Sequence, residues 1–437
     1  MTTTSLSKTA MDTTVVRVTG GRPLSGRIPV QGSKNIALHL YAAAFLADAP
    51  LVLTGTPTIL DTEVCAQILR HASATVDTGT GRFSVSPANA VRPLIHPELG
   101  RKVRTTTVLA AAVLARYGQV SFPYPGGDAF CPRLIDRHLA AMQAAGADII
   151  ASDTGIRARC SARRVRAFTV DVNTPYGPSL GATVTAMLLA ARATGTSLIT
   201  HPSVEPEVTE TARFLSQRGV LIHVDDEGLH VTGSDWIAGG EFAVAGDRIE
   251  AATMIMAAAA TGGEVHLDNI TAACIPDGLA RALASAGITL ADAPGGGVRT
   301  RRQGTLTAIK AATGPHPGLP TDTAPQMAAM LTQAHGTSLL AERVYPRRDT
   351  HIQGLRAFGA DIDATGTMTR IRGFTRLHGA DAQGADIRAA TALLIAALAA
   401  EGASTIRGVY HLRRGHGHLL DNLATLGADI TTIPGGP

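Results

Sequence analysis

The pattern of hydrophobic and polar positions repeats along the chain. An amphipathic segment with helical periodicity ends in Gly or Ser, and a short strand-like run begins almost at once. The closing residues lie 68–73 residues apart: Ser73, Gly146, Gly219, Gly287, Gly359 and Gly427. Because helices commonly end on a residue with a left-handed backbone, which glycine adopts without steric cost, this position predicts a positive φ.

A second type of helix alternates with the amphipathic one. It is rich in Ala and Leu and precedes a β-rich run, in AAAFLADAPLVL, AAAVLARYGQVSF, LLAARATGTSLI, MAAAATGGEVHL, MLTQAHGTSLLA and LIAALAAEGASTI. These helices are apolar on nearly every face, so we expect them to be buried. The sequence therefore predicts an α/β fold of six repeated units of roughly 70 residues, three in each of two domains. A single doubly wound sheet is the alternative, but its Gly-rich phosphate loop, G-x-G-x-x-G or G-x-x-x-x-G-K, is absent from the sequence.

Composition excludes several classes of protein. The chain has 437 residues, of which 45% are hydrophobic and only 4% aromatic, and its net charge of +4 is dispersed. Few aromatic side chains are available to stack on bases, so we expect no nucleic-acid partner. The apolar runs are too short to cross a bilayer, so we expect no membrane partner either.

The four cysteines show no Cys-x-x-Cys spacing, which argues against a structural zinc site or a disulfide framework and fits a cytoplasmic location. Residues 1–14 are rich in Ser and Thr without an apolar core, so they predict a flexible leader.

Several ordered motifs resemble those of the enolpyruvyl transferases, in particular the branch that acts on UDP-N-acetylglucosamine in cell-wall synthesis. They are QGSKNIAL (31–38), PGGDAFCPRLIDRH (125–138), SLGATVT (179–185), EPEV (205–208), GDRIEAAT (246–253), PHPGLPTD (315–322), ADIRAATALLIA (385–396) and VYHLRRG (409–415). The resemblance implies an inside-out α/β barrel fold of two domains with the active site in the cleft between them. One domain would comprise 34–245, with a mobile loop at 123–138, and the other 15–33 plus 246–437.

The implied reaction adds an alcohol to C2 of phosphoenolpyruvate and then expels phosphate. Such chemistry needs fixed cations, a base for the hydroxyl and an acid for the C3 methylene, and no metal or organic cofactor. By resemblance, the cations that bind phosphoenolpyruvate are Lys34, Arg104, Arg133, Arg348, Arg388 and Arg414, and Lys34 and Arg414 are also catalytic. Lys34 stands where a strand turns into a helix, which suits phosphate; a surface lysine is the alternative. Any single arginine could instead form a structural ion pair, and Asp386 is a candidate partner for Arg388.

The resemblance also implies a site for a uridine nucleotide. Its residues would be Asn35, Arg133, Leu134, Ile135, Asp136, Arg137, Ser179, Leu180, Gly181, Asp322 and Val344. Ser179 to Gly181 open a buried helix whose free N–H groups can bind a phosphate, or they form an ordinary cap. Asp322 matches the family's candidate general base, and an N-cap for the following helix is a further or alternative role.

Asp128 occupies the position at which most members of the family carry a cysteine, the target of fosfomycin. The resemblance implies that Asp128 protonates the substrate and that the protein is insensitive to fosfomycin. A carboxyl group can act as this acid only if its pKa is raised well above about 3.9. The alternatives are a turn residue at position 128 and a displaced thiol at Cys131.

The residues implied to bind phosphoenolpyruvate match the family, whereas several of their neighbours depart from it. Leu134 replaces a proline, Arg347 and Asp349 flank Arg348 where Asn and Phe are usual, and His416-Gly417 replaces Tyr-Glu. These departures slightly favour a paralogue that uses the 3′-hydroxyl of UMP, as in nucleoside-antibiotic synthesis, over a UDP-N-acetylglucosamine enzyme. A non-catalytic uridine-nucleotide-binding protein and a shikimate-pathway transferase are further alternatives. His411, His416 and His418 are interpreted as surface residues, because no carboxylate pattern accompanies them.

Overall fold

The computed structural model describes residues 14–87, 92–127, 134–161 and 163–434. Their contacts divide the chain into two compact units. One unit comprises the described parts of Met1–Gln31 and Gly246–Pro437, and the other comprises Gly32–Ala245. We refer to them as the terminal unit and the inserted unit. The chain thus leaves the terminal unit after Gln31, two residues before the expected position, and returns to it at Gly246.

The described part of the inserted unit contains two mixed sheets, one antiparallel sheet and one short hairpin. The strands, in sheet order, are β15 (Gly240–Ala243), β3 (Leu51–Thr56), β5 (Gly81–Ser86) and β4 (Thr75–Gly79); β6 (Gln119–Phe122), β8 (Gly155–Cys160) and β7 (Ala147–Ser152); β13 (Leu221–Val224), β14 (Leu229–Thr232), β12 (Thr196–Thr200) and β9 (Thr169–Asp171); and β10 (Asn173–Thr174) with β11 (Gly177–Pro178). The helices are α2 (Lys34–Ala44), α3 (Leu60–His71), α4 (Pro97–Gly100), α5 (Thr106–Tyr117), α6 (Asp136–Ala144), α7 (Leu180–Ala190) and α8 (Pro206–Ser216).

The described part of the terminal unit likewise contains three four-stranded sheets. They are formed by β17 (Ile288–Asp292), β18 (Val298–Arg302), β16 (Glu264–Asp268) and β2 (Ser25–Pro29); β19 (Lys310–Ala312), β20 (Gly336–Ala341), β22 (Met368–Gly373) and β21 (Asp361–Thr365); and β23 (Asp381–Gln383), β24 (Ala403–Arg407), β1 (Thr14–Thr19) and β25 (Asp429–Pro434). The helices are α9 (Arg248–Thr261), η1 (Ala272–Cys274), α10 (Asp277–Ser285), η2 (Thr321–Thr323), α11 (Ala324–Leu331), α12 (Ile352–Ala357), α13 (Ile387–Ala399), α14 (Val409–Gly415) and α15 (Leu419–Thr425).

Five of the six sheets in the described residues share one register plan. A central strand pairs in parallel with one edge strand and antiparallel with a second strand, which pairs antiparallel with a third. In the β6 sheet, an isolated parallel bridge between Leu94 and Ser121 takes the place of the edge strand. The predicted sixfold α/β repeat is therefore confirmed. Three of the sheets also take a strand from a distant part of the sequence, because β15 pairs with β3, β2 pairs with β16, and β1 lies between β24 and β25.

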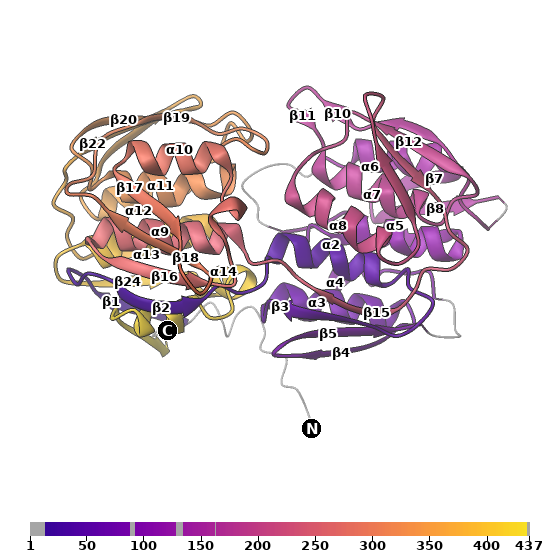
Figure 1. The fold of residues 1–437 in the computed structure, drawn as a ribbon, viewed down its shortest axis with the longest axis horizontal. Coiled ribbons are helices and arrows are strands. Elements are labelled where there is room, and N and C mark those ends of the chain that lie inside the picture. Colours follow the sequence, from indigo (N-terminus) through magenta and orange to yellow (C-terminus); the bar gives the residue numbers. More distant parts are fainter. Residues whose placement is uncertain (1–13, 88–91, 128–133, 162, 435–437) are drawn as a thin grey trace. The chain divides into compact units, whose positions relative to one another are not determined.

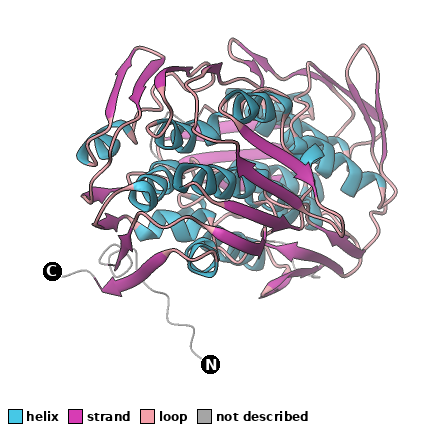
Figure 2. Cartoon of the chain, turned by 60° about the vertical axis from the view of Figure 1, so that its left-hand side comes forward, coloured by secondary structure: helices cyan, strands magenta, loops and turns pink. Residues whose placement is uncertain are grey.

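The Ala-rich helices form the interior of each unit, as predicted. Helices α2, α5 and α7 in the inserted unit, and α9, α11 and α13 in the terminal unit, are buried along most of their length. The sheets lie outside them (Figures 1 and 2). Outer strands such as β8 and β16 alternate buried with more exposed residues, because one face packs on the helices and the other meets solvent. None of the helices within the described ranges is both long and apolar enough to cross a bilayer.

The six helix-terminating residues adopt the predicted left-handed backbone. Their φ angles are 76° at Ser73, 95° at Gly146, 92° at Gly219, 89° at Gly287, 89° at Gly359 and 97° at Gly427. This conformation lets each amphipathic helix stop and its strand start immediately.

We predict that Gly219→Ala lowers the free energy of unfolding by about 1 kcal/mol, because an L side chain at φ 92° is strained. The space itself is open, since an added Cβ would lie no closer than 3.9 Å to the Trp236 carbonyl oxygen. The control is Gly79→Ala in strand β4 of the same unit, where a Cβ meets nothing within 4 Å and φ is not left-handed. Urea denaturation followed by circular dichroism measures both, and equal stabilities for the two variants would contradict the prediction.

Candidate active site

Lys34 is the first residue of helix α2. The hydroxyl oxygen of Ser33 caps this helix by accepting the Ile36 N–H at 3.4 Å. The Lys34 ammonium lies 3.0 Å from a carboxylate oxygen of Asp61, and the two side chains are only 9% and 5% exposed. A buried ammonium needs such a counter-charge, so the interpretation as a surface lysine is wrong. Sequence analysis missed Asp61, because an acidic residue in the first turn of a helix usually serves the helix itself.

The two segments predicted to bind a nucleotide lie at the N-termini of α6 and α7. Leu134 and Ile135 precede α6, and Asp136 and Arg137 form its first turn. Ser179 caps α7, where its hydroxyl oxygen accepts the Ala182 N–H at 3.3 Å, and Leu180 and Gly181 follow. The cap accounts for Ser179 structurally, and it leaves other N–H groups of the first turn to bind an anion.

His138 joins these two segments. Its Nδ1 lies 2.7 Å from the hydroxyl oxygen of Thr185 on α7. A Cβ at Gly181 would lie 2.8 Å from His138 Cε1, so the absence of a side chain at 181 makes room for the imidazole. Burial lowers the pKa of His138 to about 4, and the same cause lowers that of nearby His39 to about 4. Both rings are therefore neutral at physiological pH, and neither was singled out from the sequence.

Other predicted residues of the inserted unit are more exposed. Arg104 lies in the turn before α5, Asn35 is half-buried, and Leu134 is 74% exposed. Arg137 approaches the Asp136 carboxylate at 3.8 Å. Asp128 and Arg133, and with them Cys131, lie outside the described residues.

In the terminal unit, Asp322 joins two of the predicted arginines. Arg348 Nη1 lies 2.8 Å from one carboxylate oxygen of Asp322, and Arg388 Nη2 lies 2.7 Å from the other. Both guanidinium groups are almost fully buried, whereas the Asp322 side chain is 25% exposed. The carboxylate is thus held from two sides.

Two local predictions for these residues are wrong. Helix α11 begins at Ala324 behind Thr323, so Asp322 is not its N-cap. Asp386 instead caps α13 by accepting the backbone N–H groups of Arg388 and Ala389, and the carboxylate paired with the Arg388 guanidinium belongs to Asp322. A local sequence pattern cannot distinguish a cap from a partner that lies 66 residues away.

Glu342 anchors this cluster and was missed in the sequence. One carboxylate oxygen accepts the Thr313 hydroxyl at 2.7 Å and the backbone N–H groups of Val344 and Tyr345, and the other accepts the Thr321 hydroxyl at 2.8 Å. Thr321 in turn accepts a hydrogen bond from Arg348. The only available indication was a carboxylate placed directly after the apolar strand β20.

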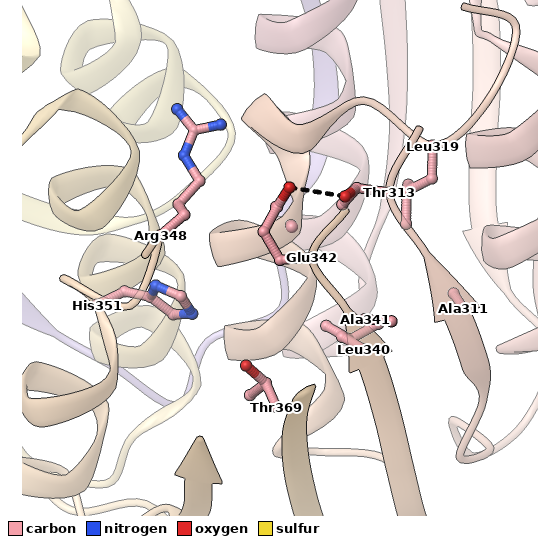
Figure 3. A pocket seen from close by; sticks show the side chains of 10 residues that line it. Ala311, Thr313, Leu319, Leu340, Ala341, Glu342, Arg348, His351 and Thr369 are labelled. Carbon is pink, nitrogen blue, oxygen red and sulfur yellow. Dashed lines mark hydrogen bonds between the residues drawn. The ribbon is translucent and has the colours of Figure 1, made fainter. Parts of the chain in front are cut away.

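A small cavity opens beside Glu342, Arg348 and His351 (Figure 3). Its volume of about 20 Å³ suits a single water-sized molecule, so it is not a substrate pocket. His351 is buried, which lowers the pKa of its imidazole to about 4.

Arg414 is buried in α14, and its neighbour His416 corrects a further prediction. His416 is 3% exposed rather than a surface residue, and its Nδ1 lies 3.2 Å from a carboxylate oxygen of Glu250 on α9. His411 is partly buried and His418 is exposed. Within the described ranges, no cluster of three or more His, Cys, Asp or Glu side chains is arranged to hold a metal ion.

Within each unit, the predicted residues gather at the N-terminal ends of the interior helices. Lys34 begins α2, Ser179 caps α7 and Arg388 lies in the first turn of α13. Arg104 and Asp322 lie just before α5 and α11. Helix N-termini carry partial positive charge and free N–H groups, so this arrangement favours phosphate and carboxylate ligands.

Comparison with known proteins identifies the class of enzyme. Residues 18–423 match the family described as EPSP synthase (3-phosphoshikimate 1-carboxyvinyltransferase). The chain therefore belongs to this family of enolpyruvyl transferases, and it is an enolpyruvyl transferase.

The relatives give a finer comparison. The chain is 39% identical to UDP-N-acetylglucosamine 1-carboxyvinyltransferase 3 of Symbiobacterium thermophilum, over 95% of this chain and 97% of the relative. It is 34% identical to the UDP-N-acetylglucosamine 1-carboxyvinyltransferase of Sorangium cellulosum, over 96% of this chain and 99% of that relative. Among solved structures, the enolpyruvyl transferase NikO of Streptomyces tendae is similar with a TM-score of 0.84 and 26% identity, over 97% and 99%. EPSP synthase of Acinetobacter baumannii, at 18% identity and a TM-score of 0.76, shares the fold.

We predict that Glu250→Gln reduces the pH dependence of stability between pH 5 and 8. Burial raises the pKa of Glu250 to about 7, so the folded chain binds a proton that the unfolded chain has released. The stabilisation is complete below about pH 4.5 and is lost as the pH rises through about 7, which corresponds to up to about 3 kcal/mol. The amide carries no titrating group, and this component disappears.

Urea denaturation at four pH values checks the prediction. The matched control is Glu264→Gln in the same unit, where the side chain is 40% exposed and no change in pH dependence is expected. A Glu250→Gln protein with the wild-type pH profile would show that burial of the Glu250 carboxylate does not cause the pH dependence of stability.

Proposed function

We propose that the protein transfers the enolpyruvyl group of phosphoenolpyruvate to a sugar hydroxyl of a uridine nucleotide, with release of phosphate. UDP-N-acetylglucosamine is the first candidate acceptor. One observation carries this choice: relatives named for that acceptor are 34–39% identical to the chain over at least 95% of its length.

The proposed mechanism is addition followed by elimination. Lys34, Arg104, Arg133, Arg348, Arg388 and Arg414 neutralise phosphoenolpyruvate. Asp322 accepts the proton of the acceptor hydroxyl while the hydroxyl oxygen bonds to C2 of phosphoenolpyruvate. Asp128 protonates C3. The bond from C2 to the phosphate oxygen then breaks, C3 returns its proton, and the enol ether and inorganic phosphate leave.

On the nucleotide side, the proposed ligands are Asn35, Arg133 to Arg137, Ser179 to Gly181, Asp322 and Val344. Two features support the segments in the inserted unit. The N-termini of α6 and α7 meet through His138, and free N–H groups at a helix start suit a diphosphate. No metal or organic cofactor takes part in the proposed reaction.

A second candidate acceptor is UMP. The departures at Leu134, Arg347, Asp349 and His416 favour it, because they surround family residues without replacing them. Leu134 is exposed, and His416 is buried against Glu250, so the two substitutions change very different surroundings.

Release of inorganic phosphate from phosphoenolpyruvate, measured in parallel with UDP-N-acetylglucosamine and with UMP, tests the acceptor. We expect turnover with UDP-N-acetylglucosamine; turnover with UMP alone would assign the second candidate. If neither nucleotide supports release while shikimate 3-phosphate does, the uridine-nucleotide proposal is wrong. Binding of both nucleotides without any turnover would instead indicate a non-catalytic protein.

For Asp128→Ala we expect kcat to fall by about 100-fold or more, whereas the Kd of the nucleotide changes less than threefold. A proton donor acts chiefly in the transition state, so its removal affects turnover and spares ground-state binding. Steady-state kinetics and isothermal titration calorimetry measure the two quantities. Equal losses in kcat and affinity would argue for a structural turn residue at position 128.

A further inference from the structure

A closed hydrogen-bond network in the terminal unit surrounds the residues that follow Arg414. The Gln31 backbone N–H donates to one carboxylate oxygen of Glu250 at 3.2 Å, and His416 Nδ1 lies 3.2 Å from the other. The Gln31 side-chain amide donates to the Gly415 carbonyl at 3.0 Å and accepts the Gly417 N–H at 3.1 Å. Gln31 therefore holds the backbone on both sides of His416.

The network lies where the chain leaves and re-enters this unit. Gln31 is the last residue before the inserted unit, and its carbonyl accepts the Asp247 N–H at 2.8 Å. Asp247 caps α9 through the Ile249 and Glu250 N–H groups. Glu250 is thus fixed from its own helix while it holds the His416 ring.

Burial makes the pair between Glu250 and His416 sensitive to the loss of either partner. Both side chains are 1% exposed. A buried polar group that loses its hydrogen-bond partner cannot recover the bond from solvent, so its surroundings shift to find another. A change at His416 is therefore expected to move the backbone to which it is attached.

Arg414 is expected to move with that backbone. The His416 N–H donates to the Leu412 carbonyl at 2.7 Å, which closes the last turn of α14, the turn that contains Arg414. Gly415 packs so closely on Ile387 that a Cβ there would lie 2.7 Å from Ile387 Cγ2. Ile387 precedes Arg388, so the same contact aligns the backbones that carry both arginines.

We propose that His416, held by Glu250 and Gln31, is a positioning residue for Arg414. The inference rests on the proposed function, in which Arg414 binds phosphoenolpyruvate. The proposal gives a role to His416, which with Gly417 replaces the Tyr-Glu that is usual in the family. The pair of His416 and Glu250 fixes the backbone next to the Arg414 guanidinium. A guanidinium that is already held in place loses less conformational entropy when an anion binds to it.

The test compares His416→Ala with wild type and with the control His418→Ala, whose side chain is 48% exposed two residues away. We expect His416→Ala to lower kcat/KM for phosphoenolpyruvate about tenfold and to leave the Kd of UDP-N-acetylglucosamine within twofold. His416→Gln, which restores a side-chain donor, recovers at least half of the loss on a logarithmic scale. Gln31→Ala reproduces the defect, and the double variant is no worse than about tenfold, because both changes act on one loop.

Thermal unfolding and direct calorimetry of phosphoenolpyruvate binding distinguish the possible failures. If His416→Ala melts like wild type and keeps wild-type kcat/KM and Kd for phosphoenolpyruvate, the positioning role is wrong. The role would also be overturned if His416→Ala lost affinity for the nucleotide and thermal stability as well as activity, and if His416→Gln did not restore them. A wild-type protein that binds phosphoenolpyruvate but turns over neither nucleotide contradicts the proposed function alone, and the inference is then judged on the affinity of His416→Ala for phosphoenolpyruvate.

Discussion

Charge neutralisation inside the fold is the constraint on which the candidate site depends. A protein that binds a small, highly charged acid must bury cations, and each unpaired buried charge costs several kcal/mol. The structure meets this cost with carboxylates of its own: Asp61 holds Lys34, and Asp322 holds Arg348 and Arg388. These carboxylates keep the cations in place and ordered before any substrate arrives. In the proposed function, an incoming anion would meet a site in which charges are already organised, and it would gain affinity without first ordering long side chains.

The repeated architecture explains where these groups lie. Each unit of sequence contributes one interior helix, and the interior helices are so apolar that polar residues are tolerated mainly at their ends. The ends that carry Lys34, Ser179 and Arg388 are the N-terminal ones, whose partial positive charge adds to that of the side chains. The candidate residues therefore lie on rigid elements. In the terminal unit, the buried carboxylate of Glu342 holds Thr321, which accepts a hydrogen bond from Arg348, and that of Glu250 lies against His416.

Much of the fold could be predicted because its determinants are local. A helix that ends at Gly219 or Gly427 does so because of that residue's own backbone freedom, and an Ala-rich run such as that of α13 is buried because it has no polar face. The candidate site was predictable only in part. The motifs indicated Lys34, Asp322 and the arginines, but they also suggested helix capping as a further or alternative role for Asp322, and His416 was expected at the surface. Asp61, His138 and Glu342 were not recognised at all, because carboxylates and imidazoles near helix or strand ends normally have local explanations.

The sequence by itself determined the six-unit repeat, the left-handed residue that ends each amphipathic helix, the burial of the Ala-rich helices and the chemical types of the residues available for an anionic substrate. These properties follow from periodicity, backbone sterics and side-chain charge within one segment. Only the tertiary structure decided which charge pairs with which. The partners Asp322 and Arg388 are 66 residues apart, and Glu250 and His416 are 166 apart. Such pairs depend on packing that brings distant segments together and on burial that makes an unpaired charge too costly, and neither is encoded in any local pattern.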